Sequence, residues 1–157
     1  MGKKTGKNPT DRGKLGVKRS VLIDGRGVPL AAAVDGANVH DQKLLAATLD
    51  GIAVMRPEVE PYRPQHLCLD KGYTGEPVEQ EVRGRGYIPH LPAKGVPAST
   101  KDRRHGNARR WKVERTHSWV NRARRLLIRW EKKVSNYFGF LLLQFAIVAL
   151  RTAGVLG

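Results

Sequence analysis

Cysteine is almost absent from this sequence, since Cys68 is the only one among 157 residues. A single cysteine excludes an internal disulfide, and its position in an apolar run predicts a small core residue. The five histidines and Cys68 are not spaced as zinc ligands, so no structural zinc site is expected. This cysteine usage fits a reducing cytoplasm.

Long apolar runs are also scarce. The first residues, MGKKTGKNPTDRGK, contain no apolar segment of the kind that signal peptides carry. Residues 136–153, NYFGFLLLQFAIVALRTA, are apolar nearly all round, but Gln144 interrupts the run and Arg151 ends it. Because the run is shorter than the roughly 20 residues that a membrane span needs, it predicts a helix buried in the core or against a partner.

Acidic residues are few, and the basic excess is unevenly distributed. The chain has 29 Lys and Arg against 14 Asp and Glu, a net charge of +15. Residues 1–20 carry a net charge of +6 and residues 101–133 a net charge of +10, whereas residues 21–100 carry −2. A near-neutral body with two basic ends is typical of proteins that bind nucleic acid. The alternatives are a solvated basic surface or a ribosome-associated, RNA-binding protein.

The pattern of apolar residues, glycine and proline predicts a mixed α/β layer. The expected elements are an arm or loop at 1–16, a hairpin of strands 17–24 and 28–35, a helix from about 40 to 52, a strand at 67–70, a helix at 77–83, an edge strand at 87–91 and a loop at 94–107. Asp41 is expected in the first turn of its helix, where a negative charge is stabilising. A helical stripe then recurs at Val113, Thr116, Val120, Ala123, Leu127 and Trp130.

Two carboxylates stand out from this framework. Asp70 ends the predicted strand at 67–70, where it could be a turn residue, a helix cap or a catalytic group on a rigid frame. Glu114 is one of three acids among the sixteen charges of residues 101–133. Helical spacing places Arg110, His117 and Asn121 on its face, away from the apolar stripe. Glu114 could therefore form a salt bridge with Arg110, or bind a metal among phosphate-binding cations.

Three collinear segments carry a resemblance to a known family. LGVKRSVLIDGRGVPLAAAVDGANVHD, HLCLDKGY and RRWKVERTHSWVNRARRLLIRWEKK resemble the C-terminal part of the DDE transposases, most closely the insertion-sequence-five family. The resemblance implies an α/β, RNase H-like fold with a mixed sheet and flanking helices. It also implies that Asp70, before Lys-Gly-Tyr, is the second catalytic Asp. Glu114 would be the catalytic Glu, and Arg110 the Arg of an Arg-x3-Glu pattern. The family pattern has Tyr where Asn107 stands and a basic residue where Asn121 stands.

The first catalytic Asp of that family lies on a strand upstream of the segment that begins this chain. We therefore expect the sheet to lack its first, central strand, and residues 17–157 to form an incomplete DDE domain. Asp24 and Asp35 lie at hairpin or strand ends, where turn roles are expected. One hypothesis is that the chain is the second of two reading frames joined by ribosomal frameshifting, since codons for Lys3 and Lys4 could form an adenine run.

The resemblance implies strand cleavage and transfer with Mg²⁺ or Mn²⁺ bound by Asp70 and Glu114. Expected partners are double-stranded DNA, at the element ends and at the target, and either an upstream-frame segment or a second copy of the chain. No membrane is expected as a partner. The expected location is the bacterial cytoplasm, in association with the nucleoid. Trp111 and Trp119 could stack on bases, whereas Trp130 is expected in the core. The alternative is a catalytically inactive, DNA-binding, truncated transposase that acts as a regulator or inhibitor of the full enzyme. The predicted DNA-binding residues are Lys71, Arg115, Arg122, Arg124, Arg125, Arg129, Lys132 and Lys133.

Overall fold

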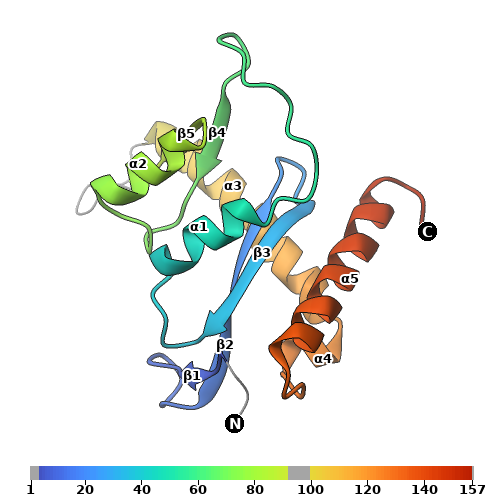
Figure 1. The fold of residues 1–157 in the computed structure, drawn as a ribbon. Helices are drawn as coiled ribbons and strands as arrows, with labels where there is room; N and C mark the ends of the chain where they lie inside the picture. The colour runs from blue at the N-terminus through green and yellow to red at the C-terminus, as the bar shows by residue number, and fades with distance from the viewer. Residues whose placement is uncertain (1–3, 92–99, 157) are drawn as a thin grey trace.

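The computed structural model describes residues 4–91 and 100–156, with side chains described for residues 4–91 and 111–156. Figure 1 shows the arrangement of its helices and strands. In chain order, the elements are β1 (Gly6–Lys7), β2 (Leu15–Ile23), β3 (Pro29–Gly36), α1 (Gln42–Asp50), β4 (Gln65–Cys68), α2 (Glu76–Gly84), β5 (Tyr87–His90), α3 (Thr100–Asn121), α4 (Arg124–Leu127) and α5 (Val134–Thr152).

The predicted hairpin is confirmed, and its turn explains the role of Asp24. Strands β2 and β3 pair antiparallel, with Ser20 opposite Ala33. The Asp24 carboxylate accepts hydrogen bonds from the backbone N–H groups of Arg26 and Val28, each at 2.8 Å. Gly27 has φ of +89°, a conformation that glycine adopts without the steric cost other residues incur. Asp24 is therefore a turn-forming residue.

A second unit, β4–α2–β5, forms a parallel pair of strands with a helical crossover. His66 lies opposite Ile88 and Cys68 opposite His90. Helix α2 begins with Glu76 and Pro77, and proline suits the first turn because its missing N–H has no helical partner there. The predicted strand, helix and edge strand of this region are all present. Cys68, however, is exposed, so the prediction that it lies in the core is wrong.

Two hydrophobic clusters lie on opposite faces of the β2–β3 hairpin. Neighbouring residues of a strand face opposite sides of the sheet, so β2 contributes side chains to both clusters. Val17 and Val21 pack with α3, α4 and α5, whereas Leu22 packs with α1, α2 and β4. Figure 1 shows α1 on one side of the hairpin and α5 on the other. The Ala-rich sequence of β3 follows from this arrangement, because a strand covered on both faces needs apolar residues throughout.

The fold is mixed α/β and is compatible with an RNase H-like domain. Its described strands form two small sheets, one in the order β1–β2–β3 and one of β4 and β5. The loop after β4 reaches the first sheet, where the Tyr73 and Ser20 hydroxyl groups lie 3.3 Å apart. The residues predicted as an N-terminal arm include β1, which pairs with β2 at Gly16.

The predicted loop at 94–107 and the predicted stripe of α3 both need correction. Residues 94–99 lie outside the described residues, and helix α3 already begins at Thr100. The single helical stripe is wrong beyond Asn121, because Ala123 has ψ of 104° and the chain turns before α4 begins. This turn resets the helical phase, so Leu126 is buried and Leu127 is exposed.

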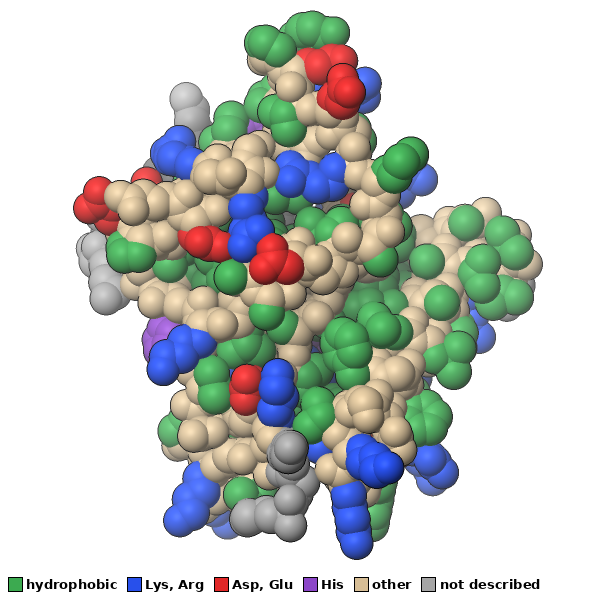
Figure 2. All heavy atoms as spheres, viewed as in Figure 1, with side chains coloured by type: hydrophobic (Ala, Val, Ile, Leu, Met, Phe, Trp, Pro, Cys, Tyr) green, Lys and Arg blue, Asp and Glu red, His purple; other side chains and the backbone are tan. Residues whose placement is uncertain are grey.

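Helix α5 buries one face and exposes the other. Its buried residues are Tyr137, Leu141, Phe145 and Val148, which contact the hairpin, α3 and α4. The opposite face exposes Leu142, Leu143 and Leu150, and Figure 2 shows hydrophobic side chains along α5. Within the described residues, α5 alone is long and apolar enough to cross a membrane. One face of this helix packs in the core, so the predicted burial is confirmed for that face only.

Candidate functional site

Asp70 stands at the end of β4, in a tight turn that it helps to form. Its carboxylate accepts a hydrogen bond from the backbone N–H of Gly72 at 2.9 Å, and its carbonyl accepts one from that of Tyr73 at 3.1 Å. The side chain nevertheless stays exposed to solvent. Because the strand and the turn hold its backbone, the carboxylate is fixed in direction while remaining accessible.

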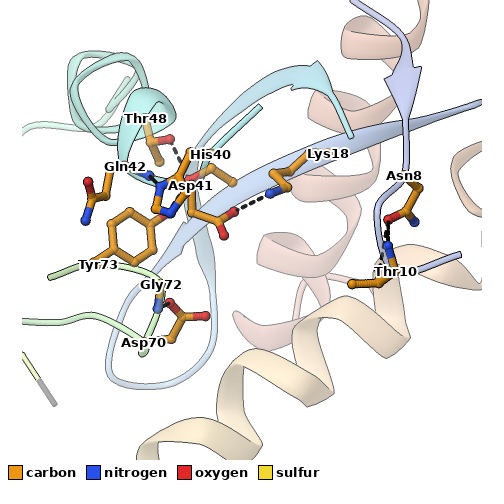
Figure 3. Close-up of polar contacts among 11 residues, drawn as sticks. Asn8, Thr10, Lys18, His40, Asp41, Gln42, Thr48, Asp70, Gly72 and Tyr73 are labelled. Carbon is orange, nitrogen blue, oxygen red and sulfur yellow. Dashed lines mark hydrogen bonds and ion pairs between the residues drawn. The ribbon is translucent and has the colours of Figure 1, made fainter. Parts of the chain in front are cut away.

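Asp41, from the N-terminal end of α1, lies beside Asp70 (Figure 3). A Cβ atom built on Gly72 would lie 3.1 Å from Oδ2 of Asp41 and 3.1 Å from Oδ1 of Asp70. The two carboxylate oxygens are therefore separated by at most twice that distance. A side chain at position 72 would come close to both carboxylates, so this close approach favours glycine. Asp41 also pairs with Lys18 of β2, at 3.1 Å from Nζ to Oδ1.

This grouping was not predicted from the sequence. Asp41 was expected to stabilise the start of its helix, but its side chain makes no cap hydrogen bond and instead reaches Lys18. Asp41 and Asp70 lie far apart in the sequence, and no periodicity connects them, so the sequence carries no signal for their contact.

Tyr73 lies close to both acids and is partly buried. Burial raises the pKa of its phenol above the ordinary value of 10.0, and the charges of Asp41 and Asp70 raise it further, against the opposing effect of the hydrogen bond with Ser20. Tyr73 therefore stays protonated at neutral pH and can donate a hydrogen bond.

Glu114 lies on α3 in a separate, open hollow of about 510 Å³. The hollow is also lined by His117, Ser118, Asn121, Arg122 and Leu127. Helical spacing had placed His117, Ser118 and Asn121 with Glu114, and the structure brings these side chains together. Arg110 was expected on this face too, but its side chain lies outside the described residues.

Two neighbours of Glu114 interact with Arg19 of β2. The Asn121 side-chain oxygen accepts a hydrogen bond from Arg19 at 2.7 Å. Burial, and the positive charge of Arg19, lower the pKa of His117 below its ordinary 6.5. His117 is therefore a neutral imidazole at physiological pH, able to accept a hydrogen bond at one ring nitrogen.

Helix α3 also forms hydrogen bonds with the tip of the β2–β3 hairpin. Lys112 donates a hydrogen bond to the Gly25 carbonyl at 2.5 Å, and Thr116 donates one to the Gly27 carbonyl at 2.7 Å. Arg115 donates to the Arg26 carbonyl. The carbonyl groups of three consecutive turn residues thus accept hydrogen bonds from side chains on one face of α3. These bonds fix the helix relative to the hairpin.

The predicted DNA-binding residues differ in how much of their hydrogen-bonding capacity is already used. The guanidinium of Arg115 lies between the indole rings of Trp111 and Trp119, at 4.5 and 4.7 Å from the ring centroids. Arg129 donates to the carbonyls of Lys4, Glu131 and Lys132. Six of the predicted DNA-binding residues have exposed side chains: Lys71, Arg122, Arg124, Arg125, Lys132 and Lys133.

Two further expectations from the sequence are settled by burial and hydrogen bonding. Trp130 is 77 % exposed, so the prediction that it lies in the core is wrong. Asp35 accepts a hydrogen bond from the backbone N–H of Gly36 and lies 3.7 Å from Lys4, which gives it a structural role at the end of β3.

The side chains that the structure describes contain no group of three or more His, Cys, Asp or Glu residues placed to hold a metal ion. Asp70 and Asp41 form a pair, and Glu114 lies in its own hollow beside His117. These residues do not by themselves make a three-ligand metal centre.

Comparison with known proteins identifies the family of the chain. Residues 1–149 match the family model described as "Transposase DDE domain". The chain is 36 % identical over 154 residues to a Burkholderia cepacia protein named "Putative transposase for insertion sequence element IS402", and the match covers 95 % of this chain and 70 % of that protein. No solved structure matches. The chain thus belongs to the family of DDE-domain transposases of insertion sequences.

Proposed function

We propose that this chain binds the DNA of its insertion sequence and contributes Asp70 and Glu114 to a catalytic centre for DNA strand cleavage and transfer. The position of Asp70 carries this proposal. It is an accessible carboxylate fixed by a turn after a strand, beside Asp41, which in turn pairs with Lys18. A rigid frame of this kind is what a catalytic carboxylate requires.

A divalent ion, Mg²⁺ or Mn²⁺, is the cofactor proposed for this centre. Carboxylate oxygens are the donors these hard ions prefer, so Asp70 and Glu114 are suitable ligands by type. Bound there, the ion would activate a water or a 3′-hydroxyl group and stabilise the leaving oxygen of a phosphodiester. The described side chains hold no three-ligand group, and in this proposal a further carboxylate comes from outside them.

The two sheets offer a place for the element that would bring this carboxylate. Strands β2 and β4 belong to separate sheets, with Tyr73 and Ser20 connecting them through side chains. Beyond its pairing with β1 at Leu15 and Gly16, β2 pairs with β3 alone, and β4 pairs with β5 alone among the described residues. We propose that an added strand would pair between β2 and β4. An upstream-frame segment or a second copy of the chain could supply it.

The exposed cations would bind the DNA backbone. Arg122 lines the hollow that contains Glu114, and Arg124 and Arg125 follow it directly on the next helix. Phosphate contacts from such side chains release counterions, so affinity should fall steeply with salt and depend little on sequence.

A second candidate is a DNA-binding transposase without catalysis, which would occupy element ends or join the complete enzyme as an inhibitor. The observation that favours it is that the described side chains hold no three-ligand group. The two candidates share DNA binding and differ in metal-dependent cleavage.

Substitution of the two carboxylates separates these candidates. Binding and cleavage of element-end DNA would be measured for this chain, alone and fused to the sequence encoded upstream, with Asp70→Asn, Glu114→Gln and the exposed control Glu58→Gln. Catalysis predicts that the fused protein cleaves with Mg²⁺ or Mn²⁺. Both site variants should then keep DNA affinity and lose cleavage, while the control keeps both activities.

Cleavage that survives Asp70→Asn and Glu114→Gln would remove these residues from the catalytic centre. DNA binding by a fused protein that never cleaves would favour the inhibitor. A double substitution of Arg124 and Arg125 to Ala should lower the slope of log K against log salt by about 2, because each phosphate contact contributes about 0.9. An unchanged slope would place the DNA elsewhere.

A further inference from the structure

The segment from the end of α4 to the start of α5 exposes large apolar side chains. Leu127 is 60 % exposed, Ile128 59 % and Trp130 77 %. Hydrophobic residues of this size are normally buried, and a group of them together on the surface is typical of an interaction site.

The exposure follows from an alternation of side-chain directions. Ile128 has an extended backbone, with φ of −122° and ψ of 119°, so neighbouring side chains face opposite sides. Arg129 is turned inward and Trp130 outward, and the Glu131 side chain is only 8 % exposed. Arg129 and Glu131 thus face the protein, while Ile128 and Trp130 face solvent.

The inward residues hold the segment firmly. The Arg129 guanidinium donates to the carbonyls of Lys4, Glu131 and Lys132 at 3.3, 2.9 and 3.2 Å. On the other side, Glu131 lies 3.4 Å from Arg125.

The core adds a second anchor just before this segment. Leu126 is buried, and its carbonyl accepts a hydrogen bond from the Tyr137 hydroxyl at 3.2 Å. Trp130 is therefore presented outward by a well-anchored backbone rather than by a loose loop.

The surroundings of these apolar side chains are strongly basic. Residues 124–133 contain five Arg and Lys, and the side chain of their single acid, Glu131, is only 8 % exposed. Figure 2 shows Lys and Arg side chains at the lower end of α5, where the helix begins. A second copy of the same surface would bring like charges together, whereas a polyanion with apolar, stackable groups complements both features.

We propose that Trp130, with Ile128 beside it, is a wedge that stacks on a nucleotide base exposed in distorted DNA. The proposal rests on the DNA binding proposed above and specifies what this surface recognises. Arg124, Lys132 and Lys133 contact the flanking phosphates, and the apolar side chains enter where base stacking is interrupted. Apolar wedges flanked by cations act in this way at kinked or unpaired base steps.

Two DNA probes distinguish the wedge from general DNA binding. One is a matched duplex, and the other is the same duplex with one unpaired 2-aminopurine. The full chain would be compared with Trp130→Ala, Trp130→Phe and Lys132→Ala/Lys133→Ala by fluorescence anisotropy and 2-aminopurine emission. Tyr62→Ala is the matched control, because Tyr62 is an equally exposed aromatic, at 79 %, between Glu60 and Arg63.

The wild-type chain should prefer the probe with the unpaired base and quench its 2-aminopurine emission. Trp130→Ala should lose about 5- to 150-fold in affinity for that probe, the range for base–aromatic stacking, and much less for the matched duplex. Trp130→Phe should restore most of the preference, Tyr62→Ala should leave it unchanged, and the double Lys variant should weaken both probes equally.

Equal affinity of Trp130→Ala and wild type for the unpaired probe would overturn the wedge. So would a dimer in the absence of DNA that Trp130→Ala dissociates, because the surface would then bind a second copy. Failure of the wild-type chain to bind either probe would instead overturn the proposed DNA binding itself, and the wedge with it.

Discussion

The contact between α3 and the hairpin tip includes one buried hydroxyl group, and the removal of this group has a calculable cost. Thr116 is 1 % exposed, and its hydroxyl lies 2.7 Å from the Gly27 carbonyl and 3.0 Å from that of Lys112. Thr116→Val replaces the hydroxyl by a methyl group of similar size. We therefore expect no cavity, only the loss of a hydrogen bond to a buried carbonyl.

The expected destabilisation is about 1–3 kcal/mol, because leaving a buried polar group without a partner costs this much. Urea slopes of small proteins are about 1–3 kcal/mol per M, so the unfolding midpoint should fall by about 1 M. The assay is urea unfolding of Thr116→Val and wild type, followed by circular dichroism, with the slope compared to confirm that only stability has changed.

Thr116→Ser is the matched control, since it keeps the hydroxyl and loses only a methyl group. Its unfolding midpoint should fall less than that of Thr116→Val. If Thr116→Val shifts the midpoint by less than about 0.3 M, or if serine is the worse of the two, the hydrogen bond to Gly27 does not hold α3 and the reasoning is refuted.

Two other predictions concern the same helix and its neighbours. Gly27→Ala should destabilise the protein by about 1–3 kcal/mol in the same assay, since φ is +89° and the new Cβ would lie 2.9 Å from Arg115. The control Gly25→Ala, at a site with open space, should destabilise it less. Equal destabilisation by the two substitutions would contradict the prediction. The folded-state pKa of His117 is lowered below its ordinary 6.5, so between 6.5 and that lower pKa the unfolded chain binds more protons than the folded one. Stability should therefore fall as the pH drops below 6.5 toward the folded-state pKa. His117→Gln should flatten this fall in urea unfolding at several pH values, and an unchanged pH dependence would show that His117 does not titrate this way.

Local patterns predicted much of the fold. The Gly-Arg-Gly link between two apolar stretches predicted the hairpin, because glycine supplies the positive φ that its turn uses. Proline and glycine bracketed α2, and the apolar spacing of 42–50 predicted α1. These elements depend on short-range backbone and side-chain preferences, which the sequence records directly.

Predictions failed where packing overrides local pattern. The stripe through Leu127 and Trp130 assumes one continuous helix, but the turn at Ala123 lets Leu126 enter the core and leaves Trp130 outside. Cys68 has an apolar neighbour on each side, yet alternation along β4 buries Leu67 and exposes Cys68. In both cases the residue's surroundings depend on which face another element covers.

The sequence by itself determined the family, the distribution of charge, and the identity of Asp70 and Glu114 as candidate catalytic carboxylates. The tertiary structure alone decided that Asp41 lies beside Asp70 and pairs with Lys18. It also decided that the hairpin carbonyls face Lys112 and Thr116, and that Trp130 points to solvent among cations. The physical reason is that residue type and spacing are local properties, whereas these contacts join residues brought together only by the packing of distant elements.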